Sequence, residues 1–112
     1  MGDGEAGGVA MKNLQARLPF VLVDSVLDRD DRGEGHPGEA SFYVNAAGQR
    51  AGFIIRCPGC NVPQALAFRG IPGATGATWE WDGNAEQPTL TPSVHHVGCW
   101  HGWLTAGQWV PC

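Results

Sequence analysis

The chain has 112 residues, enough for one domain with a modest core and too few for two. Its 17 glycines and 8 prolines predict many turns and little helix, whereas five tryptophans supply large apolar groups for a core. A formal net charge of −4 argues against binding driven by nucleic-acid phosphates. No apolar run approaches the roughly 20 residues of a membrane span, and the acidic start "MGDGEAGGVA" does not resemble a signal peptide. We therefore expect a small, loop-rich intracellular β domain.

The N-terminal third is predicted to hold one strand between less regular segments. "KNLQARL" at residues 12–18 has the length for one or two helical turns before Pro19. The apolar and β-branched run "FVLVDSVL" at residues 20–27 predicts a strand. Residues 28–39 are charged and punctuated by glycine, which is typical of a solvated loop.

A hairpin is predicted in the middle of the chain. Two β-rich runs, residues 41–44 and 51–56, flank the turn-prone "NAAGQ", and the second run leads directly into Cys57. A further short strand is expected in "NVPQALAF", where Pro63 marks a sheet edge. Residues 69–77 are rich in glycine and predict a loop.

Two more strands and a second hairpin are expected toward the C-terminus. In "TWEWDGN", Trp79 and Trp81 alternate, which places both on one face of a strand. The prolines of "PTLTPSV" keep residues 88–94 extended. The segment "CWHGWLTAGQWVPC" at residues 99–112 predicts a hairpin that turns near Ala106-Gly107.

The motif Cys57-Pro-Gly-Cys60 is compatible with a redox pair, a disulfide framework or half of a metal site. A thioredoxin-like redox pair requires a strand-to-helix step, and Pro63 and the lack of helical periodicity downstream argue against one. Two disulfides or four buried thiols would also account for four cysteines, but disulfides are disfavoured in a reducing compartment. A Pro-Gly centre lets both thiolates point to one spot. A metal knuckle is therefore the preferred interpretation.

The C-terminal hairpin carries three more metal-binding candidates. A two-residue turn places His101 opposite Cys112, and alternation along the strand puts Cys99 on the same face. Cys57, Cys60 and Cys99 are the expected ligands, and His101 and Cys112 compete for the fourth position of a tetrahedral site. A mixed sulfur and nitrogen set favours Zn²⁺, and a full ligand set predicts a closed, structural site.

The remaining polar residues give no catalytic signal. His95 and His96 are adjacent in an extended stretch, so they point to opposite faces and do not readily chelate one ion together. Glu80 and Asp82 read as surface and turn residues, because no partner base is evident. We therefore expect no catalytic residue.

The sequence thus predicts a mostly β fold, a small zinc-ribbon-like antiparallel domain with hairpins and little helix. The zinc-stabilised β domain is assigned to residues 37–112. Residues 1–36 are assigned to an N-terminal arm with the first strand and loop.

Three segments, "CPGC", "WEWDGNAEQPTLTPSV" and "CWHGWL", together resemble a family of small, uncharacterised phage and prophage proteins with a zinc-ribbon-like order of motifs. The resemblance covers residues 37–112. It implies Cys57, Cys60 and Cys99 as ligands and places His101 where that family has its histidine. One residue separates Cys99 from His101 here, whereas the family usually has these two adjacent, so the fourth ligand stays open.

The resemblance implies a phage or mobile-element setting, and the biochemical role of that family is unassigned. We therefore expect a non-enzymatic, phage-encoded, zinc-stabilised module that is structural or binds protein, for example a capsid, decoration or tail-associated component. Its location would be the virion or the host cytoplasm, its partners virion or host proteins, and it would form an oligomer or an assembly subunit without membrane or nucleic acid. Two further functions remain open, a host-directed adaptor or inhibitor, and a small zinc-dependent hydrolase that uses His95 or His96 as acid and base.

Overall fold

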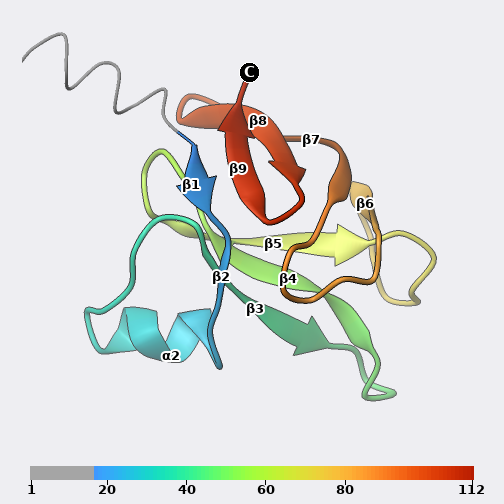
Figure 1. Ribbon diagram of the computed structural model, residues 1–112. Helices are drawn as coiled ribbons and strands as arrows, with labels where there is room; N and C mark the ends of the chain where they lie inside the picture. Colours follow the sequence, from blue (N-terminus) through green and yellow to red (C-terminus); the bar gives the residue numbers. More distant parts are fainter. Residues whose placement is uncertain (1–16) are drawn as a thin grey trace, which may run out of the picture.

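The computed structural model describes residues 17–112, which form one curved sheet of nine short strands with a single short helix (Figure 1). The elements are β1 (Leu18–Pro19), β2 (Val21–Leu22), α2 (Val26–Asp31), β3 (Glu39–Val44), β4 (Arg50–Arg56), β5 (Pro63–Phe68), β6 (Thr78–Trp81), β7 (Leu90–His96), β8 (Trp100–Thr105) and β9 (Gln108–Pro111). The prediction of a mostly β fold with little helix is confirmed. Most of the helical turn expected at residues 12–18 lies outside the described residues.

Both edges of the sheet come from one short segment near the N-terminus. The strand order is β1-β9-β8-β7-β6-β5-β4-β3-β2, with β1 antiparallel to β9 and β2 parallel to β3. Within this segment, the backbone N–H of Phe20 donates to the carbonyl of Gly107 at 2.9 Å, and that of Val21 donates to the carbonyl of Gly38 at 3.3 Å. The segment, blue in Figure 1, therefore links the C-terminal hairpin to β3 and nearly closes the sheet into a barrel.

Aromatic rings dominate the core. Phe53 is fully buried, and its ring lies 5.2 Å from that of Phe20 and 5.1 Å from that of Phe68 between centroids. Phe68 in turn stacks on Trp81 at 4.8 Å. Trp109 is also fully buried and donates its indole N–H to a backbone carbonyl at 3.0 Å. Large rings thus supply the apolar area that a chain of this size needs to fold.

The hairpin predicted from residues 41–44 and 51–56 is confirmed as β3 and β4, which pair antiparallel. The strand expected around Pro63 is β5, which pairs with β4 on one side and with β6 on the other, so the prediction of a sheet edge there is wrong. Pro63 is tolerated because it is the first residue of the strand, ahead of the residues that pair with β6. Trp79 and Trp81 lie on β6, and both pack against the buried core, as their alternation predicted.

The second predicted hairpin is confirmed as β8 and β9, and its turn fixes the register. Ala106 and Gly107 have φ values of 47° and 78°, and Thr105 pairs with Gln108 across them. Two consecutive positive φ values are the signature of a type I′ turn, which matches the twist of the flanking strands. No helix within residues 17–112 is long and apolar enough to span a membrane.

The strand predicted at residues 20–27 forms only in part, because α2 begins within this run. The hydroxyl of Ser25 caps the helix by accepting the Asp28 N–H at 3.1 Å. A serine at this position indicates the start of a helix, but the surrounding apolar run favoured the prediction of a strand. The helix continues into the segment predicted to be a loop. Phe20 and Val26 are both buried, so the stretch from β1 through α2 packs as part of the same folded unit.

Candidate functional site

The Cys57-Pro-Gly-Cys60 motif forms a tight loop between β4 and β5. Cys57 is fully buried directly after β4, whereas Cys60 is half-buried. The backbone carbonyl of Cys57 accepts the Asn61 N–H at 2.9 Å, and the Gly59 N–H points to the Cys57 Sγ at 3.4 Å. Backbone hydrogen bonds therefore fix both thiols at one end of the loop.

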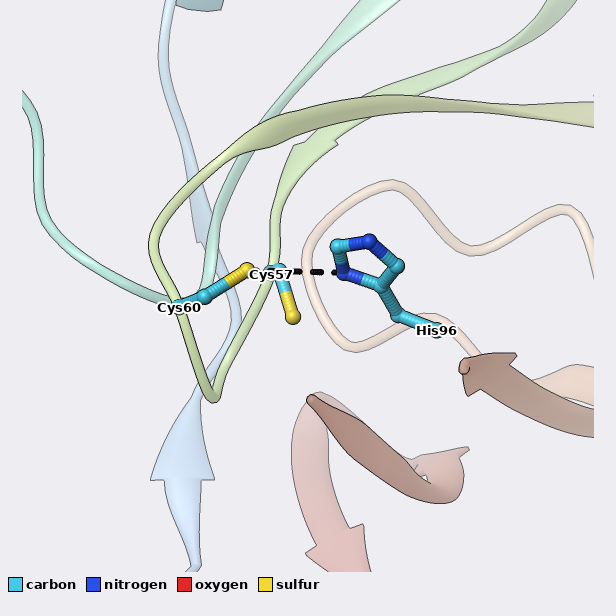
Figure 2. Close-up of side chains that lie close together, drawn as sticks. All are labelled: Cys57, Cys60 and His96. Atoms are coloured by element: carbon cyan, nitrogen blue, oxygen red, sulfur yellow. Dashed lines mark hydrogen bonds between the residues drawn. The ribbon is translucent and has the colours of Figure 1, made fainter. Parts of the chain in front are cut away.

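These two thiols meet the ring of His96, the last residue of β7 (Figure 2). Ligand atoms of the three side chains all lie within 4.8 Å of one another, and the Cys60 Sγ is 3.5 Å from the His96 Nδ1. A tetrahedral ion with sulfur at about 2.3 Å and nitrogen at about 2.0 Å holds that pair of atoms about 3.5 Å apart. Cys57, Cys60 and His96 thus lie close enough to bind a metal ion.

Cys99 lies directly beside this group. The Cys60 thiol is the main cause that raises the pKa of Cys99, so the two side chains are neighbours, and a Cβ added at Gly59 would meet the Cys99 carbonyl oxygen at 2.6 Å. Glycine is therefore required at position 59 because the knuckle approaches the Cys99 backbone so closely. A third sulfur therefore lies next to the group formed by Cys57, Cys60 and His96.

The thiols differ in how readily they lose a proton. Burial raises the pKa of Cys57, and the contact with Cys60 raises the pKa of Cys99. The pKa of Cys60 is lowered, first by a hydrogen bond from the Val62 backbone and then by the Cys99 thiol. Cys60 is therefore the thiol most easily converted to the thiolate that binds a metal.

His96 was not among the predicted ligands, although the sequence carried a signal for it. His96-Val-Gly-Cys99 has the same spacing as Cys57-Pro-Gly-Cys60, and it folds into a turn in which the Cys99 N–H donates to the His96 carbonyl at 2.9 Å. The two adjacent histidines do point to opposite faces, as expected from an extended stretch. His96 turns toward Cys60, and His95 turns toward His101.

The structure therefore brings together two of the predicted ligands, Cys57 and Cys60, with His96, and a third predicted ligand, Cys99, lies beside them. The remaining two candidates lie elsewhere. Cys112 is exposed just after β9, and it pairs with His101 only through its backbone N–H, at 3.0 Å from the His101 carbonyl oxygen. The ring of His101 faces β7 instead.

That ring contacts Ser93. The Ser93 Oγ and the His101 Nε2 are 3.0 Å apart, which is hydrogen-bond distance. Ser93 lies where the pairing of β7 with β8 becomes irregular, between Leu90 and Val94. Its backbone carbonyl accepts the indole N–H of Trp79 at 3.1 Å, so β6 helps to hold it in place.

A protein-family model described as "Bacterial ubiquitination-like system serine protease (BubE)" matches residues 28–112, well over half of the chain. The chain belongs to the BubE family. No curated protein and no solved structure matches it.

BubE membership corrects the predicted function. The family is described as serine proteases of a bacterial system, so the prediction of a non-enzymatic, phage-encoded virion module is wrong, and so is that of a host-directed adaptor or inhibitor. A zinc-dependent hydrolase does not fit that description either, because such an enzyme uses a metal ion for the reaction, whereas a serine protease uses a serine. The physical reason for the error is that the paired cysteines lie close together in the sequence, whereas the contact between Ser93 and His101 forms only in the folded sheet.

Proposed function

We propose that this chain is a serine protease in which Ser93 is the nucleophile and His101 the general base. The 3.0 Å contact between the Ser93 Oγ and the His101 Nε2 carries the proposal. The chain has only two other serines. Ser25 caps α2, and the hydroxyl of Ser41 accepts the Val26 N–H at 2.9 Å. Ser93 is the serine whose hydroxyl meets a histidine.

The chemistry follows from this pair. The Ser93 Oγ attacks the carbonyl carbon of the scissile amide while its proton passes to the His101 Nε2. The C–N bond then breaks, the leaving amine takes the proton from His101, and an ester on Ser93 remains. Water hydrolyses this ester with His101 again acting as base, which restores the hydroxyl. The family description supports a substrate from a ubiquitination-like system, such as a ubiquitin-like protein or its conjugates.

A fluorophosphonate probe, which reacts with activated serines, tests this proposal directly. We expect the label on the peptide that contains Ser93 and no label in Ser93→Ala. His101→Ala should slow labelling about 10²- to 10⁴-fold, because general-base assistance is worth that much. The matched control is His36→Ala, which removes a histidine in the loop after α2, and this variant should be labelled at the wild-type rate. Label on Ser25 or Ser41, or equal labelling of Ser93→Ala, contradicts the assignment.

We also infer that Cys57, Cys60 and His96 bind Zn²⁺ together with Cys99 as the fourth ligand. Three sulfurs and one imidazole nitrogen suit zinc, and four protein ligands leave no open position, which is the composition of a structural site. The ion would tie the loop between β4 and β5 to the turn between β7 and β8. Binding of this kind contributes on the order of 10 kcal/mol to the folding of small zinc domains.

Native mass spectrometry of single-site variants tests the zinc site. We expect one zinc per chain, lost or strongly weakened in Cys60→Ser, His96→Ala and Cys99→Ser and retained in Cys112→Ser and His101→Ala. Chelation should lower the unfolding midpoint of the wild-type protein, because the ion binds only the folded site. Loss of zinc in Cys112→Ser or His101→Ala, with retention in His96→Ala, would instead restore the ligand set expected from the sequence.

A further inference from the structure

We propose that His95 is a positioning residue, whose ring holds the imidazole of His101 in the orientation that presents Nε2 to Ser93. This inference rests on the proposed protease function. His95 would not touch the substrate or take part in proton transfer, but would act through His101.

The backbone places the two rings against each other. His95 of β7 and His101 of β8 are direct partners in the antiparallel register. Their ring centroids are 4.4 Å apart with an interplanar angle of 26°, which is a stacked arrangement. Directly opposed residues on one face have Cβ atoms only about 5 Å apart, so the register alone brings the rings into contact.

His101 needs such a restraint. In serine proteases of known mechanism, a third group, usually a carboxylate, orients the histidine toward the serine. Within residues 17–112, no carboxylate hydrogen-bonds or pairs with the ring of His101, whose side chain is exposed. Its neighbour on the other strand, Cys112, contacts it through the backbone. A free exposed imidazole turns readily about its second side-chain torsion, and stacking limits that rotation.

His95 is itself held between two fixed points on β7. Ser93, two residues before it, is anchored by the indole of Trp79. His96, the next residue, turns to the opposite face and lies in the metal-binding group. Three of the four positions from Ser93 to His96 therefore supply the nucleophile, the ring that stacks on its base, and a metal-binding side chain.

Three substitutions at position 95 distinguish an effect of ring stacking on His101 from an effect of side-chain volume alone. Phenylalanine keeps a flat ring, leucine has bulk without a ring, and alanine removes both. We expect His95→Ala and His95→Leu to lower the maximal rate of fluorophosphonate labelling at Ser93 about fivefold, the equivalent of a cross-strand aromatic contact. His95→Phe should restore most of that rate. The half-saturating probe concentration and the zinc content should stay at wild-type values.

The outcomes distinguish the two proposals. If wild-type Ser93 is not labelled, the protease proposal fails, and the role of His95 fails with it. If wild-type Ser93 is labelled and His95→Ala labels as fast, or His95→Phe is as slow as His95→Leu, the positioning role alone is overturned. Should His95→Ala lose zinc or unfold, the comparison of Phe with Leu decides, because both fill the position with a large apolar side chain.

Discussion

Gly59 is the residue at which the two halves of the metal-binding group come closest. A side chain there would meet the backbone carbonyl carbon of Cys99 at 3.1 Å and its oxygen at 2.6 Å. Real Cβ atoms do not approach that near, and the Cys99 backbone, which is held in a hydrogen-bonded turn, yields little. The glycine is therefore needed for space, since its φ does not lie in the left-handed region.

We predict that Gly59→Ala is destabilising by about 1–3 kcal/mol, the usual cost of overpacking, and that it weakens zinc binding. The control is Gly76→Ala, because nothing lies within 4 Å of a Cβ at that position. That variant should change the free energy of unfolding by less than about 0.5 kcal/mol. Denaturant titration and metal content measure both effects. Equal behaviour of the two variants would show that the knuckle does not pack against Cys99.

At the scale of elements, one buried ion pair joins α2 to the start of β3. Glu39 is only 6% exposed, and its carboxylate accepts two hydrogen bonds of 3.0 Å from Arg29. Burial by itself raises the pKa of Glu39, but the hydrogen bonds from Arg29 and from the His36 backbone outweigh it, so this pKa lies below its ordinary value. The folded state therefore prefers the ionised carboxylate.

A lowered folded-state pKa stabilises the protein above the pKa of the unfolded chain, about 4.3 for glutamate. That stabilisation is lost as the pH falls through the folded-state pKa. We predict that Glu39→Gln lowers the unfolding midpoint at pH 7 and that its difference from wild type shrinks toward pH 3. Thermal unfolding between these pH values measures the effect. Glu80→Gln is the matched control, because Glu80 pairs with Arg69 where both side chains are more than half exposed, and such pairs contribute little. A difference that stays constant with pH would argue against this role for Glu39.

Another relation at this scale concerns β7, which serves both candidate sites. Its alternation sends Ser93 and His95 toward His101 on one face and His96 toward Cys60 on the other. A zinc ion at the end of this strand would restrain the same β7–β8 hairpin that sets the serine–histidine distance. The two sites are thus mechanically linked through one pair of strands.

At the scale of the molecule, the near-closure of the sheet depends on contacts between distant parts of the chain. β1 and β2 pair with strands about 90 and 20 residues further along, and Phe20 between them packs against both Phe53 and Trp109. Closing a sheet in this way leaves little exposed strand edge. Neither contact is local, so no short stretch of sequence signals it.

Much of the fold could be predicted because its signals are local. The β3–β4 hairpin, the face shared by Trp79 and Trp81, and the turn at Ala106-Gly107 each follow from residues close together in the chain. The start of α2 at Val26 was not predicted, because the helix cap is the single residue Ser25, whereas the apolar run that favours a strand is several residues long. The cap favours a helix and the apolar run favours a strand, and the sequence alone does not show which of the two preferences prevails.

The sequence by itself determined the β class, the hairpins and the metal-knuckle geometry of Cys57 and Cys60, since spacing and side-chain alternation act over a few residues. Only the tertiary structure decided that His96 joins those thiols and that Ser93 meets His101. Both contacts depend on how β7 is registered against β8 and on how that hairpin lies against the loop after β4. A side-chain period of two makes such partners sensitive to a one-residue shift, so the packed sheet, and not the spacing, selects them.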